Sequence, residues 1–169
     1  MRAILRLIDS LSEWTGKTAR WLCVLLILVM TYEVVMRYAF NAPTLWGYET
    51  SMMIGAALYS LAWAHTHRHH GHVRVDVFYT HLSPKGKALV DVIGDLLFFT
   101  PLVLIFIYAS AFWTWRAWSI GEKSVETYWY PPIAPLRTVV LIGFCLFGLQ
   151  GGAQLIRDIY FLIRNKPYD

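Results

Sequence analysis

Charged residues are scarce in this sequence. Asp, Glu, Lys and Arg make up 15% of its 169 residues, whereas about 25% is usual for a soluble domain. Hydrophobic residues make up 57%, against a usual share of about 45–50%, and the mean hydropathy is +0.45. These departures exclude an ordinary soluble domain and indicate a protein that folds in a lipid bilayer.

Cysteine is nearly absent, since Cys23 and Cys145 are the only two and each lies inside an apolar run. In the topology predicted below they lie at different depths, too far apart for a disulfide, and we expect both to act as small buried hydrophobic residues. A cleaved signal peptide is not predicted either. Asp9 and Glu13 interrupt the N-terminal segment, and no small-x-small cleavage site follows the first apolar run.

Four apolar runs predict an all-α integral membrane fold with four transmembrane helices in a single membrane domain, residues 1–169. The spans are expected at about 21–40, 48–65, 88–118 and 138–157. The third run exceeds the roughly 20 residues of a perpendicular span, so it should tilt or protrude, with Pro101 as a kink point. Residues 1–20 carry apolar and charged side chains on opposite sides of a helix, which predicts an amphipathic interfacial helix before the first span.

Lysine and arginine are concentrated in the first 20 residues, in the connection between the second and third spans, and in the C-terminal tail. These segments hold eleven of the 15; the other four are Arg37, Arg116, Lys123 and Arg137. Cytoplasmic loops are enriched in Lys and Arg, so both termini and the middle connection are predicted to be cytoplasmic. The same pattern accounts for the net charge of +4, and no nucleic-acid-binding motif is present.

The first span ends in a charged pair, Glu33 and Arg37, four residues apart. On a helix this spacing places both side chains on one face, in the favourable order for an ion pair. Charges inside an apolar segment are costly unless they have a partner or face protein. We therefore expect residues 31–49, which turn at Pro43, to form an extracytoplasmic helix–turn–helix that faces protein.

All six histidines lie in one stretch that begins at the end of the second span: His65, His67, His69, His70, His72 and His81. Imidazole suits zinc, but the stretch has no fixed spacing to a cysteine or to a second histidine pair. The other spans contain no histidine that could complete a bis-histidine haem site. The composition favours a basic segment near anionic headgroups, and the sequence predicts no metal site.

No carboxylate lies near the middle of any span, where a transport site is expected. Asp91 and Asp95 lie one turn apart at the start of the third span, and such a pair could bind a cation or relay protons. Pairing with neighbours at the membrane interface is the favoured interpretation. The charge pattern therefore argues against a substrate path through this chain.

Small residues predict where membrane helices approach closely. The second span contains several of them and is expected to be central in the bundle. In the fourth span, two glycines four residues apart form a small-xxx-small pair. The predicted helix-packing positions are Gly55, Gly148 and Gly152.

Four motifs, taken in order, resemble those of a known family. They are Glu33-x3-Arg37-Tyr38-x-Phe40-Asn41-x-Pro43 with Trp46 and Glu49; His72-Val73-Arg74-Val75-Asp76; Ser124 through Trp129-x-Pro131-Pro132; and Gly143 to Gln150. Together with the four spans, this set resembles the small membrane subunit of tripartite ATP-independent periplasmic (TRAP) transporters, the DctQ-like family. The resemblance covers nearly the whole chain.

The resemblance implies a transport role and no enzymatic activity. In such systems a periplasmic binding protein captures the substrate, commonly an organic acid. A large, DctM-like membrane subunit with elevator-type motion imports it with sodium. The small subunit packs against the large one in the bacterial inner membrane, so no cofactor is expected in this chain and the sodium is expected in the large subunit.

The resemblance and the charge pattern together suggest a role for each motif. Residues expected at the large-subunit interface, or in structural ion pairs, are Glu33, Arg37, Arg74 and Asp76. Residues expected on the face that docks the binding protein are Glu49, Ser124, Trp129, Pro131 and Pro132.

Two other functions are compatible with a small four-span protein. A stand-alone multidrug exporter also has a glutamate in its first span, but it needs that acid near mid-membrane, whereas Glu33 lies near the outer end beside Arg37. The membrane anchor subunit of a redox enzyme would bind haem or quinone, and the placement of the histidines argues against this. The transporter subunit is therefore favoured.

Overall fold

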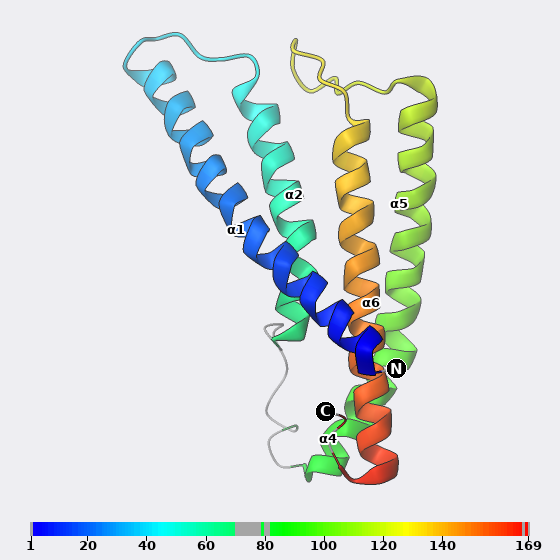
Figure 1. Ribbon diagram of the computed structural model, residues 1–169. Coiled ribbons are helices and arrows are strands. Elements are labelled where there is room, and N and C mark those ends of the chain that lie inside the picture. Colours follow the sequence, from blue (N-terminus) through cyan, green and yellow to red (C-terminus); the bar gives the residue numbers. More distant parts are fainter. Residues whose placement is uncertain (1, 70–78, 80–81, 167, 169) are drawn as a thin grey trace.

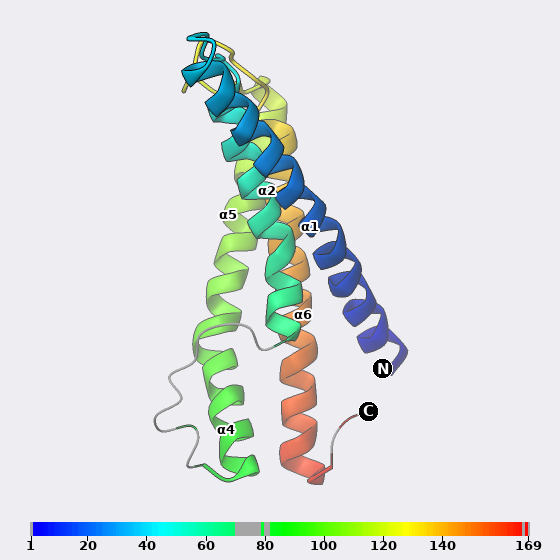
Figure 2. The same cartoon turned by 90° about the vertical axis from the view of Figure 1, so that its left-hand side faces the viewer.

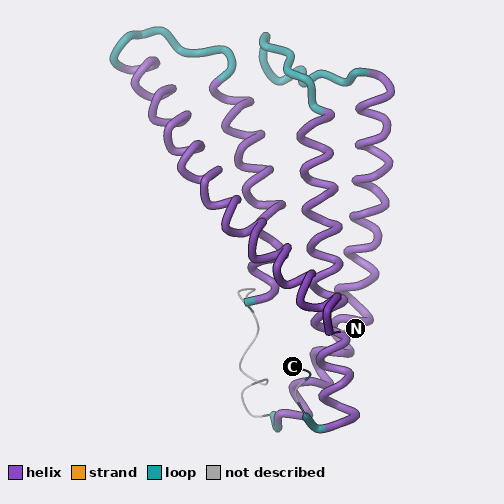
Figure 3. The backbone as a smooth tube through the Cα atoms, viewed as in Figure 1, coloured by secondary structure: helices purple, strands orange, loops and turns teal. Residues whose placement is uncertain are grey.

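The computed structural model describes residues 2–69, 79, 82–166 and 168. These residues form helices and the turns between them (Figure 3), with an isolated bridge between Lys123 and Pro132 but no sheet. The helices are α1 (Arg2–Tyr38), α2 (Gly47–Arg68), α4 (Pro84–Gly94), the π-helical turn η1 (Asp95–Phe99), α5 (Thr100–Ile120) and α6 (Ala134–Arg164). The prediction of an all-α fold is confirmed.

Because α4, η1 and α5 run into one another, the described residues form four helical rods (Figure 1). α1 packs on α2, α2 on α6, and α6 on α5, which leaves α2 and α6 in the middle. The turns 39–46 and 121–133 lie together at one end (Figures 1 and 2). Both chain ends, the end of α2 and the start of α4 lie toward the other end, as expected for a chain that runs up and down twice.

The first helix differs from the prediction. A separate interfacial helix was expected over residues 1–20, but α1 is one continuous helix of 37 residues. It contains no proline, and its Gly16 lies where α1 crosses α2: a Cβ there would be 2.3 Å from Cγ of His65. At 1.5 Å per residue α1 is about 55 Å long, well beyond the roughly 30 Å of bilayer hydrocarbon. Accordingly, it runs diagonally across α2 in Figure 1.

The third rod has a capped start and an irregular middle. Ser83 accepts a hydrogen bond from the backbone N–H of Gly86 at 3.2 Å, as an N-cap should. The irregularity expected at Pro101 lies just before it, where the N–H of Thr100 donates to the carbonyl of Asp95, five residues back. Proline has no N–H, and its ring clashes with the carbonyl four residues earlier, so the helix widens into a π turn.

Among the described residues, three rods are long and apolar enough to cross a membrane: α1, the rod from α4 to α5, and α6. α2 has the expected position and is 22 residues long, but it is less apolar, with Glu49 near its start and His65 near its end. Because α2 lies between α1 and α6, it needs less lipid-facing surface than the others. That α2 also spans the membrane stays a prediction.

Apart from Leu5 and Val103, the buried side chains of the helices are small or polar. The largest of the fully buried ones are Gln150, Ser12 and Ser60, whereas large hydrophobic side chains are exposed, including Phe98 at 74% and Leu28 at 61%. In water such a surface would be unfavourable. In a bilayer, lipid tails are as apolar as leucine, so helices associate through close packing and hydrogen bonds. The burial pattern therefore agrees with a membrane-embedded bundle.

Candidate functional site

The first polar cluster lies at the turn between α1 and α2, and we call Glu33, Arg37, Thr44 and Gly47 the turn cluster. Glu33 is only 7% exposed. Its Oε1 accepts a hydrogen bond from Nη2 of Arg37 at 2.5 Å, so the two residues form the ion pair that their spacing predicts. A carboxylate held beside a cation in this way suits a structural contact. Its contribution to a subunit interface stays a prediction.

Thr44 holds the other oxygen of Glu33. Its hydroxyl and its backbone N–H both donate to Glu33 Oε2, the N–H at 3.2 Å. Thr44 Oγ1 also accepts from the N–H of Gly47 at 3.1 Å, at the start of α2. A Cβ on Gly47 would lie 2.6 Å from Thr44 Oγ1 and 2.7 Å from Glu33 Oε2, so this approach requires glycine. The turn cluster thus ties the end of α1 to the beginning of α2.

A second contact joins α2 to the loop between α5 and α6. Glu49 is 3% exposed, and its Oε1 accepts from both the N–H and the hydroxyl of Thr127, each at 2.7 Å. Glu49 therefore lies inside the molecule, where it fixes the position of the loop. Its role in docking a binding protein stays a prediction, and any such role would act through the loop.

The loop 121–133 folds back on itself. The N–H of Ser124 donates to the carbonyl of Pro131 at 2.8 Å, and both of these residues are buried. Trp129 and Pro132 are exposed. The loop therefore divides the predicted docking residues into an internal pair that sets its shape and an external pair that a partner can reach.

Arg137, at the start of α6, connects this loop to α5. Its Nη2 donates to Oε1 of Glu122 at 2.7 Å, and its Nη1 donates to the carbonyl of Trp113 at 3.1 Å. The guanidinium carbon also lies 5.5 Å from the centre of the Trp113 ring, within the range of a cation–π contact. In the sequence Arg137 served only as an orientation signal, so this contact was not predicted.

A polar network crosses three helices toward the other end, and we call Asp9, Ser12, Arg68, Gln150 and Arg157 the crossing network. Gln150 accepts from the Ser12 hydroxyl at 2.7 Å and donates to Oδ1 of Asp9 at 3.1 Å. Nη2 of Arg157 donates to Oδ2 of Asp9 at 2.5 Å. Nη1 of Arg68 donates to the Asp9 carbonyl oxygen at 2.8 Å. The crossing network joins the first part of α1 to the end of α2 and to α6.

Sequence reasoning missed the crossing network. Gln150 closes one of the four motifs, but Asp9 was assigned to an amphipathic face and Arg157 to an orientation signal. A partial signal was present, because Asp9 and Ser12 lie three residues apart and share a face of α1. Their contacts with Gln150 span 141 and 138 residues of sequence, and no local spacing rule connects residues so far apart.

Glycines allow close contact between helices at several positions. A Cβ on Gly143 would lie 2.6 Å from the carbonyl oxygen of Ser60, so α2 and α6 touch there. Gly148 lies against side chains of α5. Beyond the backbone of its own helix and its chain neighbours, a Cβ on Gly55 or Gly152 would meet no described atom within 4 Å. A packing role for these last two would require a partner, and it stays a prediction.

Some predicted positions lie outside the described residues: Arg74 and Asp76, together with His70, His72 and His81. Two of the other histidines lie beside Glu13 of α1: His65 in the last turns of α2, and His69 directly after its end. The three residues are close enough to ligate one metal ion.

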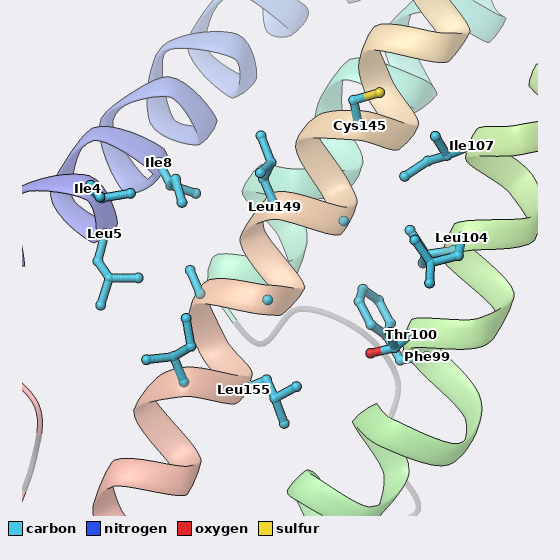
Figure 4. A pocket seen from close by; sticks show the side chains of 15 residues that line it. Ile4, Leu5, Ile8, Phe99, Thr100, Leu104, Ile107, Cys145, Leu149 and Leu155 are labelled. Atoms are coloured by element: carbon cyan, nitrogen blue, oxygen red, sulfur yellow. The ribbon is translucent and has the colours of Figure 1, made fainter. Parts of the chain in front are cut away.

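An apolar groove of 680 Å³ lies between the first turns of α1 and the α5–α6 pair (Figure 4). Apart from Thr100 and Cys145, the described residues that line it are apolar. Side chains from all three helices contribute, among them Ile4, Ile8, Leu104 and Leu149. Because specific binding of a polar solute needs placed polar groups, this groove suits lipid or an apolar protein surface.

Comparison with known proteins gives a match over most of the chain. The family described as "Tripartite ATP-independent periplasmic transporters, DctQ component" matches residues 26–160. This range contains the turn cluster, Glu49, the loop 121–133 and the α6 part of the crossing network, but it begins after Asp9 and Ser12. No match was found among curated proteins.

Proposed function

The chain belongs to the family of DctQ components of tripartite ATP-independent periplasmic transporters, and on this basis we propose that it is the small membrane subunit that scaffolds a large, DctM-like elevator subunit. In the proposed assembly a periplasmic binding protein delivers an organic acid or a similar small polar solute. The large subunit imports that solute together with sodium. The chain itself is not an enzyme.

The observation that carries this proposal is the distribution of charge along the helices. No Asp, Glu, Lys, Arg or His occurs in residues 21–32, 50–64, 96–115 or 138–156. A site for sodium and a carboxylate near the midplane needs polar or charged ligands. Since these four apolar stretches hold no such charged group, we assign the transport path to the large subunit.

The turn cluster supports the same proposal against that of a proton-coupled exporter. An exporter needs an acid that binds and releases protons and substrate in turn. Glu33 is instead engaged by Arg37 on one oxygen and by Thr44 on the other. These contacts favour a structural role in holding the α1–α2 turn.

We assign the contact with the large subunit to the turn cluster and to the exposed residues that follow it. Tyr38 is 80% exposed and Phe40 67%, and the half-exposed Arg37 lies beside them. Aromatic residues and arginine are enriched in protein interfaces. Arg74 and Asp76 belong to the same proposal as contacts on the opposite side of the membrane.

We assign docking of the periplasmic binding protein to the tip of the loop 121–133. Its exposed residues include the hydrophobic and aromatic side chains of Val125, Tyr128, Trp129, Tyr130 and Pro132. Glu49 of α2 accepts two hydrogen bonds from Thr127. These bonds fix the position of the loop, so its exposed residues are held in place for a partner. In the orientation that the lysine and arginine distribution favours, this loop faces the periplasm and both chain termini face the cytoplasm.

Uptake by cells that lack only this chain tests the proposal. We expect sodium-dependent uptake of at least one radiolabelled organic acid from a broad panel to be lost, and to return when the chain is supplied from a plasmid. Unchanged uptake of every acid, together with increased sensitivity to cationic drugs, would favour the exporter instead.

A further inference from the structure

Three potential metal ligands converge where α1 crosses α2. Nε2 of His69 lies 3.2 Å from Oε2 of Glu13, and Nδ1 of His65 lies 3.5 Å from the same oxygen. The three ligand atoms all lie within 4.8 Å of one another. Two ligand atoms bound to a tetrahedral zinc ion at about 2.0–2.1 Å lie about 3.3 Å apart. The two nitrogen–oxygen distances therefore match the spacing that such an ion requires.

The environment of His65 is an independent observation that points to a ligand. Its Nδ1 is enclosed, and apart from the 3.5 Å contact with Glu13 it has no hydrogen-bond partner among the described residues. An enclosed nitrogen without a partner is costly, and a metal ion would satisfy it. The ring reaches this position because Gly16 leaves space on α1: a Cβ on Gly16 would lie 2.3 Å from Cγ of His65.

The types of ligand restrict the class of ion. His65 near the end of α2 and His69 at its C-cap are four residues apart, with their ring centres 4.5 Å apart, and Glu13 adds a carboxylate. Magnesium and calcium prefer sites made of oxygen ligands. Imidazole nitrogen combined with a carboxylate suits zinc and the neighbouring divalent transition metals.

Two cationic side chains, Arg68 and Lys17, lie near the Glu13 carboxylate, and neither needs to block a metal ion there. Arg68 lies 3.2 Å from Glu13 Oε2, but it also donates to the carbonyl oxygen of Asp9 at 2.8 Å and can keep that contact. Lys17 lies 3.6 Å from the other oxygen, Oε1, and its side chain is 58% exposed, so it can turn to solvent. His69 is also exposed, which leaves a side of the site where water can complete the coordination.

We propose that Glu13, His65 and His69 bind one divalent metal ion of the zinc class, which clamps the first half of α1 onto the end of α2. Glu13 precedes the range that matches the family, residues 26–160. The proposal therefore rests on this chain's own geometry and is independent of its role in transport.

Zinc titration of the full-length chain tests the proposal. The protein would be purified in mild detergent with a tag that contains no histidine, stripped with EDTA, and titrated with zinc chloride by calorimetry. We expect one ion per chain and a higher melting temperature in zinc. Glu13→Gln and His69→Ala should each weaken binding by at least about tenfold, since losing even a residue that only orients a ligand costs about 10–100-fold.

A triple variant separates this site from the last three histidines of the stretch. His70, His72 and His81 are replaced by asparagine, and this variant should still bind one zinc ion. His69→Ala should keep the helical circular dichroism of the parent because His69 is exposed. Absence of zinc binding by the parent, or binding that the triple substitution removes while Glu13→Gln and His69→Ala leave it unchanged, would overturn the proposal.

Discussion

Gln150 of α6 accepts a 2.7 Å hydrogen bond from Ser12 of α1, 138 residues away in the sequence, and both side chains are almost completely buried. In a bilayer, burial of apolar side chains contributes little to helix association, whereas polar contacts and close backbone approach contribute directly. The fold of this chain should therefore depend on a few polar side chains and glycines more than on its large hydrophobic residues.

Substitution of Gln150 by leucine tests this dependence. Gln150→Leu keeps the size of the side chain but removes the partner of the buried Ser12 hydroxyl and one partner of Asp9, which keeps its contact with Arg157. We expect a loss of about 1–3 kcal/mol in the free energy of unfolding, the cost of leaving buried polar groups unpaired. Thermal or denaturant unfolding in detergent, followed by circular dichroism, measures it.

Gln154→Leu is the matched control, because within the described part of the chain the Gln154 side chain bonds to its own helix, to Asp158 at 3.3 Å. It should change stability much less than Gln150→Leu. Equal effects of the two substitutions would show that the contact between α1 and α6 is not important for stability.

A pair of glycine substitutions tests the close approach of α2 and α6. Gly143→Ala places a Cβ 2.6 Å from the carbonyl oxygen of Ser60, so the helices must separate, at a cost of about 1–3 kcal/mol for overpacking. The new Cβ of Gly152→Ala meets no described atom within 4 Å beyond its chain neighbours and the backbone of its own helix, and alanine is favoured over glycine in a helix by about 1 kcal/mol. Unfolding measurements should show opposite effects. A destabilised Gly152→Ala in the isolated chain, with Gly143→Ala unchanged, would contradict this packing.

The helical architecture was largely predictable from the sequence. Membrane helices are marked by long apolar runs, and the ends of these runs are marked by local chemistry, such as Ser83 and Pro84 at the start of α4. The continuity of α1 was not predictable in this way. The charged residues before position 21 suggested that the chain passes from the headgroup region into lipid there. A helix can make that passage without a break when neither proline nor an exposed glycine interrupts it.

The turn cluster should be required for a stable contact with the large subunit. Glu33→Gln removes the charge that Arg37 and Thr44 both engage, and Arg37→Ala removes the cation. Each should loosen the α1–α2 turn and lower the yield of large subunit that co-purifies with this chain from co-expressing cells. Glu126→Gln is the control, since Glu126 lies exposed in the loop 121–133. Unchanged co-purification and uptake in Arg37→Ala would refute the assignment.

The tip of the loop 121–133 should determine the affinity for the periplasmic binding protein. Trp129→Ala removes an exposed aromatic side chain, and Thr127→Val removes one of the two hydrogen bonds by which Glu49 holds the base of the loop. Both should weaken binding of the purified periplasmic protein to the membrane complex in surface plasmon resonance. Trp115→Ala serves as the control because Trp115 is 77% exposed but lies on α5. A larger effect of Trp115→Ala than of Trp129→Ala would locate docking elsewhere.

Within the candidate site, the sequence predicted the contacts between residues that are close together in the chain. The Glu33–Arg37 pair follows from a separation of four residues on a helix. The contacts of Glu49 with Thr127, 78 residues away, and of Gln150 with Ser12 depend on how the rods pack. Glu49 was consequently expected at a surface, although the α5–α6 loop covers it.

Native mass spectrometry of this 19.5-kDa chain, released from mild detergent after co-expression with the large subunit, tests the central claim most directly. The account predicts a complex of one copy of this chain with one large subunit, and partial loss of that complex with Arg37→Ala. Release of this chain alone, or as an oligomer of itself with no large subunit attached, would contradict it.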